Sequence, residues 1–134
     1  VMGEIYGSGI QDLMYETKTE PFFRYFDIRV TVPEEVRSMV NEKQVYLNPT
    51  FLSACSSYLE MVPTLYFGPY HRSIATQYAH GDSTLKDGQI REGCVVKPAM
   101  DRRSTRGNRI VAKVISEQYL LRKGSKGQKP TEYN

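Results

Sequence analysis

The pattern of apolar and polar positions, together with β-branched residues and turn signals, predicts strands in four places. Val1–Tyr6 is apolar at alternate positions and is followed by a glycine-rich turn. Phe22–Val32 (FFRYFDIRVTV) is rich in aromatic and β-branched residues, a composition typical of a strand. The other two predicted strands, the first ended by a proline and the second mostly β-branched, are Gln89–Lys97 and Arg109–Ile115.

Apolar residues at helical spacing and capping residues predict four helices. Asn48 is a suitable N-cap and is followed by proline at the first helical position. His80-Gly81 is a suitable helix end, and Ser116 is expected to cap the last helix. The predicted helices are Pro33–Asn41, Pro49–Leu59, Tyr70–Ala79 and Glu117–Lys123. Strands and helices at irregular spacing predict an α+β fold with largely antiparallel sheets and packed helices, rather than a wound βαβ fold.

Composition then limits the class of protein. The chain has 134 residues, 40% hydrophobic and 25% charged, which is ordinary for one soluble globular domain and excludes a disordered chain. It contains no apolar run long enough to span a membrane, and its first residues lack the features of a signal peptide. The two cysteines, Cys55 and Cys94, are too few for a disulfide framework, so a reduced cytoplasmic setting is expected.

The net charge of +3 is unevenly distributed. Residues 1–96 carry 8 basic and 12 acidic side chains, whereas residues 97–134 carry 10 basic and 3 acidic ones. A basic C-terminal part suggests an anionic partner such as phosphate, nucleic acid or a membrane surface. A solvated basic face would give the same composition, so charge alone leaves the two alternatives open.

Several strand segments carry charged residues. Glu4 lies between glycines in GEIYG, Asp27 follows aromatic residues in FFRYFDI, and Glu92 precedes a glycine in EGCVVKP. Glycine beside a carboxylate allows a ligand to approach the backbone. Lys113 interrupts the apolar strand IVAKVI, where burial of a lysine is costly unless it meets an anion. Taken singly, each acid is more often part of a salt bridge at the rim of a sheet.

Together and in this order, these segments resemble the covalent nucleotidyltransferases, the superfamily of ATP-dependent ligases and mRNA capping enzymes. GEIYG resembles motif III, FFRYFDI motif IIIa, EGCVVKP motif IV and IVAKVIS motif V. The EGxVxKP form of motif IV and the segments GSGIQ and YLLRKG most resemble those of the phage and bacterial RNA ligases. The resemblance covers Val1 to about Gly124 and implies a partial nucleotidyltransferase domain of the ATP-grasp-like kind.

The resemblance also implies a reaction. In this superfamily a lysine attacks the α-phosphate of ATP, AMP passes to the 5′-phosphate of an RNA strand, and a 3′-hydroxyl displaces it. ATP, Mg²⁺ or Mn²⁺, and RNA ends are therefore the expected ligands, and no membrane partner is expected.

The resemblance implies these roles residue by residue. Glu4 would contact the ribose or the lysine, Phe26 would stack on adenine, and Asp27 would support the site. Glu92 would bind the metal, while Lys97 and Lys113 would face phosphate. The RNA backbone would contact Arg102, Arg103, Arg106 and Arg109, although a solvated arginine-rich loop is an equal alternative. His71 and His80 have no acid or cysteine at ligand spacing and are interpreted as structural.

Two departures from the family pattern affect the interpretation. No K-x-D-G or K-x-N-G nucleophile motif occurs, and Lys86-Asp87-Gly88 lacks the spacer residue and falls between the wrong motifs. Motif V also carries Lys113 alone instead of two lysines. We therefore expect residues 1–124 to be part of a larger ligase domain without motif I, followed by a basic, mobile tail at 125–134.

Three alternatives stay open at this point. The chain could be a non-catalytic relative that binds nucleotide or RNA, or a split enzyme that receives its lysine from a partner. It could also belong to the DNA ligase or capping branch, because no residue here visibly recognises a 2′-hydroxyl.

Overall fold

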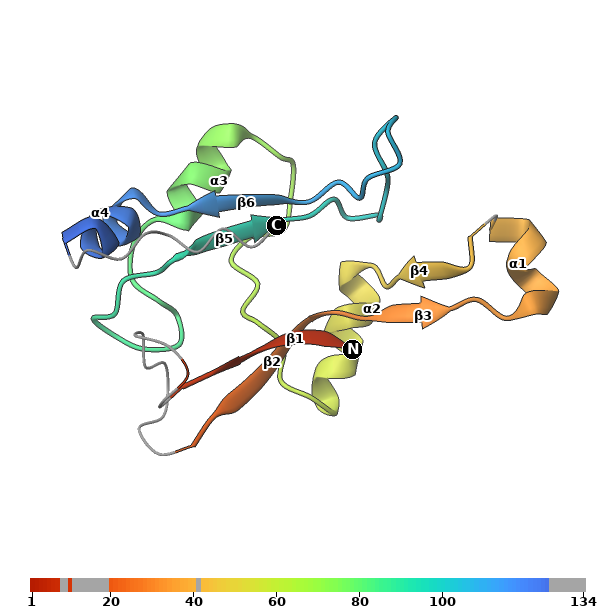
Figure 1. Cartoon of the computed structure of the whole chain (residues 1–134), viewed down its shortest axis with the longest axis horizontal. Coiled ribbons are helices and arrows are strands. Elements are labelled where there is room, and N and C mark those ends of the chain that lie inside the picture. The colour runs from red at the N-terminus through yellow and green to blue at the C-terminus, as the bar shows by residue number, and fades with distance from the viewer. Residues whose placement is uncertain (8–9, 11–19, 41, 126–134) are drawn as a thin grey trace. The chain divides into compact units, whose positions relative to one another are not determined.

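The computed structural model describes residues 1–7, 10, 20–40 and 42–125. These residues form two compact units, which are described separately below. The first unit comprises residues 1–63 and 97–110, and the second comprises residues 64–96 and those from 111 onward. Helices and two-stranded antiparallel sheets occur together, so the predicted α+β class with antiparallel sheets is confirmed (Figure 1).

The first unit is built around an antiparallel pair, β1 (Met2–Tyr6) and β2 (Phe22–Asp27). Tyr25, at the centre of β2, is fully buried. Its N–H donates to the carbonyl of Glu60 at 3.0 Å and its own carbonyl accepts from Val62 at 2.9 Å. Backbone on both sides of β2 therefore satisfies its hydrogen-bonding groups, as a buried strand requires.

The predicted strand Phe22–Val32 divides in two. β3 (Arg29–Thr31) pairs with β4 (Gln44–Tyr46) in a separate sheet, and α1 (Glu34–Val40) lies between those two strands in the chain (Figure 1). Ile28 falls between the strands, and its carbonyl accepts a hydrogen bond from Leu47 at 2.9 Å. All three residues of β3 are exposed, so the alternation of apolar and polar residues that continues into β3 does not mark a buried face there.

The helix predicted from Asn48 begins as expected and ends early. The Asn48 side chain accepts from the N–H of Phe51 at 3.2 Å, and α2 covers Pro49–Ala54. A single 3₁₀ turn, η1 (Cys55–Ser57), follows. There the hydroxyls of Ser56 and Ser57 donate to carbonyls three residues earlier, a competing bond that explains why the α-helix stops before Leu59.

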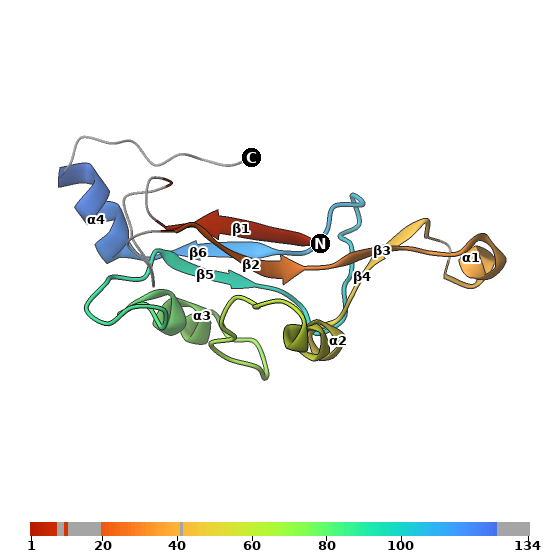
Figure 2. The same ribbon diagram turned by 90° about the horizontal axis from the view of Figure 1, so that it is seen from below.

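The second unit places α3 (Arg72–Ala79) against one face of the β5–β6 pair, Gly93–Val96 with Ala112–Ile115 (Figure 2). Cys94 and Val114 are opposite each other in register, and the Cys94 thiol reaches the carbonyl of Ala75 on α3. Burial raises the pKa of this thiol, against the opposing charge of Arg91. Both strands are present and are shorter than predicted.

The last helix, α4, covers Glu117–Ser125, so part of the predicted tail is helical; residues 126–134 lie outside the described part of the chain. The expectation that Ser116 caps this helix is wrong, because its hydroxyl is buried and has no hydrogen-bond partner among the described residues. The Ser116 N–H instead donates to the carbonyl of Glu92 at 2.8 Å. In the described ranges, no helix combines the length and the apolar composition needed to cross a bilayer.

Candidate active site

Asp27 is the centre of a charged cluster in the first unit. It ends β2, and only 2% of the residue is exposed. Its Oδ1 accepts from Lys97 Nζ at 3.2 Å and from Arg109 Nη2 at 3.2 Å, while Oδ2 accepts from Arg109 Nη1 at 2.6 Å. A buried carboxylate needs such charge-assisted partners, and here both of its oxygens have them.

Arg109 is itself held on three sides. Its Nε donates to Asp101 Oδ1 at 2.5 Å, and its guanidinium carbon lies 3.6 Å from the centroid of the Tyr46 ring. Burial acts to lower the pKa of Arg109, but the hydrogen bonds and charges of Asp27 and Asp101 outweigh it and raise the pKa. The guanidinium is therefore a permanent cation with a fixed orientation.

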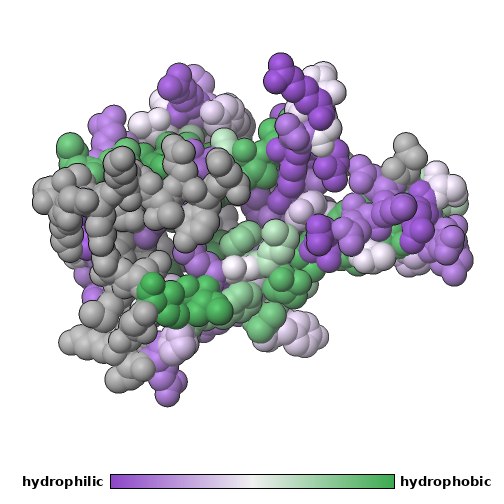
Figure 3. Space-filling model, in the orientation of Figure 1, coloured by the Kyte–Doolittle hydropathy of each residue, from purple (hydrophilic) through white to green (hydrophobic). Residues whose placement is uncertain are grey.

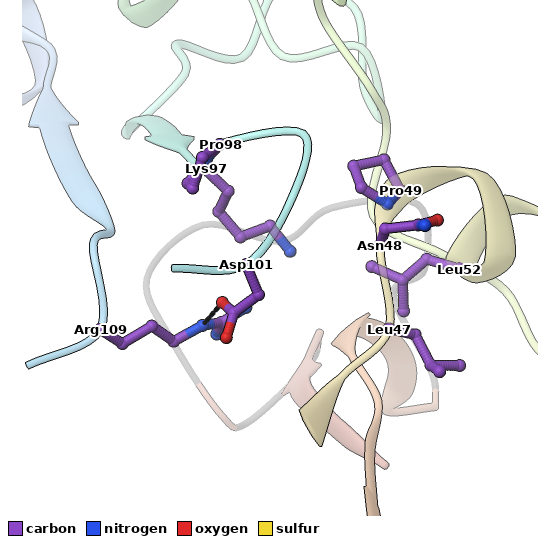
Figure 4. A pocket seen from close by; sticks show the side chains of 8 residues that line it. All are labelled: Leu47, Asn48, Pro49, Leu52, Lys97, Pro98, Asp101 and Arg109. Carbon is purple, nitrogen blue, oxygen red and sulfur yellow. Dashed lines mark hydrogen bonds and ion pairs between the residues drawn. The ribbon is translucent and has the colours of Figure 1, made fainter. Parts of the chain in front are cut away.

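Lys97 is oriented by two acceptors. Besides Asp27, its Nζ donates to the Phe26 carbonyl at 2.6 Å. An ammonium group has three N–H donors, so two are used, and the Lys97 side chain is 23% exposed. Lys97 and Arg109 line a cavity of about 10 Å³ with Leu47, Asn48, Pro49, Leu52, Pro98 and Asp101, as Figure 4 shows. That space is no larger than one water molecule, so the cluster is packed against the start of α2.

Phe26 occupies an irregularity in the β1–β2 pair. Met2 is opposite Asp27 and Gly3 is opposite Tyr25, so Phe26 is the extra residue of a β-bulge. Bulges change the direction of a side chain and are common beside functional sites. Phe26 is half-buried, and its backbone carbonyl is the one that accepts from Lys97.

Glu4 lies one strand away, opposite Arg24. Arg24 donates to the Tyr6 hydroxyl at 2.7 Å and to the Met61 carbonyl at 3.0 Å, and it pairs with Glu60 at 2.7 Å. The glycine before Glu4 has a packing role, because a Cβ on Gly3 would lie 2.4 Å from the Phe23 ring. Packing against Phe23 therefore explains why residue 3 is glycine, without the ligand contact that the sequence suggested.

Glu92 and Lys113 belong to the second unit. Glu92 is half-buried and immediately precedes β5, and Lys113 lies on β6 opposite Val95. Lys113 is exposed, so the argument that its burial demands an anion is wrong. Gly93 next to Glu92 is required by the strand pair, because a Cβ there would lie 2.1 Å from the Val114 carbonyl oxygen.

The arginine-rich segment between Met100 and Asn108 is a loop, as predicted, and Figure 3 shows it as a hydrophilic projection. Arg102, Arg103 and Arg106 are exposed on it. Arg103 pairs with Glu42 at 3.3 Å and donates to the Gly107 carbonyl at 3.1 Å. Arg109, at the end of the segment, points its guanidinium into the Asp27 cluster.

Both histidines have local roles at the ends of α3, as interpreted from the sequence. His71 Nδ1 accepts from the N–H of Ser73 at 3.3 Å at the N-cap, and His80 Nδ1 lies 2.7 Å from the carbonyl of Thr76 at the C-cap. Lys86-Asp87-Gly88 forms a surface turn in which Gly88 has φ +69°.

The structure thus brings Phe26, Asp27, Lys97 and Arg109 together and places Glu4 on the neighbouring strand. Sequence reasoning missed Arg24, Tyr46 and Asp101. Arg24 was detectable, since it is a cation in an aromatic strand, the same signal that drew attention to Lys113. Nothing local in the sequence indicated that Tyr46 and Asp101 would hold Arg109.

A comparison with curated proteins gave no match. A family model described as RNA ligase matches residues 1–115, a range that includes the complete Asp27 cluster. The chain therefore belongs to the RNA ligase family.

Proposed function

We propose that this chain provides the nucleotide and RNA contacts of an ATP-dependent RNA ligase. The ligase joins a 5′-phosphate to a 3′-hydroxyl through lysyl-AMP and RNA-adenylate intermediates. The family match supports the ligase class and an RNA substrate. The observation that carries the finer proposal is the Asp27 cluster, which holds a lysine beside an aromatic residue on a bulged strand.

In this proposal the cluster acts as a preorganised cation for phosphate. Asp27 and the Phe26 carbonyl use two donors of Lys97 and fix its direction, which leaves the third for a phosphate oxygen. Arg109 shares the Asp27 carboxylate, so we assign it mainly to positioning Lys97 and only secondarily to the RNA backbone. Charges that are fixed before the reaction need no reorganisation when the transition state forms.

The remaining roles concern the nucleoside and the second unit. Phe26 offers a π-face for adenine, and Glu4 offers a carboxylate for the ribose hydroxyls or for the attacking lysine. Lys113 is an exposed point charge that would bind a phosphate oxygen. Arg102, Arg103 and Arg106 would neutralise RNA phosphates.

Glu92 fits a magnesium ion that is held mainly by its substrate. The described residues contain no group of three or more His, Cys, Asp or Glu side chains able to hold a metal ion. Mg²⁺ commonly binds one or two carboxylates, completes its shell with water and nucleotide phosphates, and then neutralises phosphate charge. A single half-buried carboxylate such as Glu92 suits that arrangement.

The nucleophile is the part of this proposal that the printed sequence does not supply. Since it contains no K-x-D-G or K-x-N-G, we assign residues 1–124 to a partial nucleotidyltransferase domain. The lysine would come from an upstream segment or a partner chain. The missing motif also supports a second candidate, a non-catalytic relative that binds nucleotide or RNA. Reading the coding sequence upstream of Val1 separates the two, because an in-frame K-x-D-G favours the ligase.

Binding of ATP tests the proposed nucleoside site. Phe26→Leu keeps an apolar side chain of similar size and removes the ring. We expect it to weaken ATP binding by about 1–3 kcal/mol if the ring stacks on adenine as aromatic residues do on nucleic-acid bases. Isothermal titration with ATP and magnesium measures this change.

Phe22→Leu is the matched control, because Phe22 is also a half-buried phenylalanine of β2 and its ring contacts Tyr6. We expect this variant to bind ATP as the wild type does. Equal affinities in wild type, Phe26→Leu and Phe22→Leu would make Phe26 an ordinary packing residue.

A further inference from the structure

A second, larger cavity lies beside the Asp27 cluster in the first unit. It has a volume of about 460 Å³, within the range typical of small-molecule sites. Two segments line it: Glu42 and residues 44–48 with Phe51 from one segment, and residues 100–103 of the arginine-rich loop from the other. We call it the β4–loop groove.

Two aromatic side chains and a methionine line this groove. Tyr46, Phe51 and Met100 all line it. Phe51 is 61% exposed on the first turn of α2, and Met100 is 78% exposed. Large exposed apolar groups in a concave site are typical of a surface that a ligand covers.

Both acidic side chains that line the groove are already paired with arginines, whereas one lining arginine is not paired with any described acid. The two acids that line it are engaged: Glu42 pairs with Arg103, and Asp101 pairs with Arg109. Arg102 also lines the groove and forms no ion pair with any described residue. The groove therefore combines aromatic surface with a cation that is available to an anion.

From this combination we propose that the β4–loop groove binds an unstacked nucleotide of a single-stranded RNA segment. The base lies against Phe51 and Tyr46, and the adjoining phosphate contacts Arg102. Proteins recognise single-stranded RNA by stacking bases on aromatic rings and neutralising phosphates with arginine, whereas the bases of a duplex are already stacked. This inference rests on the proposed RNA ligase function and names where the substrate strand is held.

The groove is separate from the proposed nucleoside site, because neither Phe26 nor Lys97 lines it. The two share the first unit through Asp101 and Arg109: Asp101 lines the groove and holds Arg109, which binds Asp27. RNA seated in the groove would thus lie next to the cluster that orients Lys97. A strand end held there is placed beside the expected phosphate contact.

Fluorescence anisotropy with a short, labelled single-stranded RNA carrying a 5′-hydroxyl, without ATP, tests the groove directly. We expect Phe51→Ala to weaken binding at least about tenfold, the loss of one base–aromatic stack. We expect Arg102→Gln to lower the slope of log affinity against log salt by about 0.7, the loss of one phosphate contact. Urea midpoints of both variants establish that they fold.

Two controls match these changes. Tyr58→Ala removes an aromatic side chain that is 88% exposed in the same unit but does not line the groove, and Arg72→Gln removes an exposed positive charge of α3 in the second unit. Both should bind RNA as the wild type does. If folded Phe51→Ala binds like Tyr58→Ala, or loses duplex RNA as strongly as single-stranded RNA, the proposal is overturned.

A failure of this inference is distinguishable from a failure of the proposed function. Normal RNA binding by Phe51→Ala, together with ATP binding that depends on Phe26, overturns the groove and leaves the ligase proposal in place. A wild-type chain that binds neither ATP nor RNA overturns both.

Discussion

Asp27 has both a structural and a proposed functional role in the first unit: it pairs with two partly buried cations, and it orients Lys97 for the proposed phosphate contact. Its burial is tolerated because Lys97 and Arg109 compensate the charge and satisfy both oxygens. Removing one member of such a group leaves the others charged, partly buried and unpaired, which is more damaging than losing the attraction alone.

We therefore expect Asp27→Asn, which keeps the shape and removes the charge, to reduce the free energy of unfolding by about 3 kcal/mol. Urea denaturation followed by circular dichroism measures the loss. Asp101→Asn is the matched control, because the Asp101 side chain also binds Arg109 but is 22% exposed, against 3% for Asp27, and we expect it to cost clearly less, about 1 kcal/mol. Similar losses in the two variants would mean that Asp27 is not the centre of the cluster.

At this scale the sequence identified three members of the cluster but not their contacts. Asp27, Lys97 and Arg109 were each expected at a nucleotide or RNA site, and in the structure they bind one another. Lys97 and Arg109 are 70 and 82 residues away from Asp27 in the sequence, so no local sequence pattern indicates that they bind it. Lys113 shows the opposite error, since an apolar strand sequence suggested burial and the side chain is exposed.

Among the elements, the sequence located most helices and strands and misjudged where several end. Helix starts were readable because a cap and a proline act locally, as at Asn48. The break at Ile28 was not readable, because it depends on β2 and β3 having different partner strands. Glycines beside acids were interpreted as room for a ligand, and at Gly3 and Gly93 they are instead explained by packing within strand pairs.

Gly93 gives the element-scale prediction. Its φ of +153° and the 2.1 Å approach of the Val114 oxygen to an added Cβ exclude a side chain without movement of β6. We expect Gly93→Ala to destabilise the protein by about 2–3 kcal/mol, as overpacking and backbone strain together do. Gly107→Ala, with φ +80° but open space around the Cβ, should cost only about 1 kcal/mol. Equal shifts in thermal midpoint would argue against close packing at Gly93.

For the molecule as a whole, the main question is which part of the ligase reaction these residues can perform. The family match covers residues 1–115, and the cluster, the bulge and the groove all occur within it. The one lysine followed by Asp-Gly, Lys86, lies on a surface turn of the second unit and lacks the family spacing. We therefore expect this chain to bind ATP and RNA without forming a covalent adenylate.

We accordingly expect no covalent adenylate when the 134-residue chain is incubated with ATP labelled on the α-phosphate and magnesium. Denaturing electrophoresis detects the label. A labelled band that disappears in Lys86→Arg would identify Lys86 as a nucleophile and refute our interpretation of that turn.

The long separations in the Asp27 cluster also bear on how the protein acquires its structure. A growing polypeptide contains Asp27 well before it contains Lys97 and Arg109, and closing loops of this length is an entropic cost that local contacts avoid. Until the later residues arrive, burial of Asp27 would be uncompensated, so its carboxylate stays hydrated and the end of β2 cannot pack. We therefore expect the Asp27 cluster to form late in folding. An incomplete chain that ends before Arg109 is expected not to form the site.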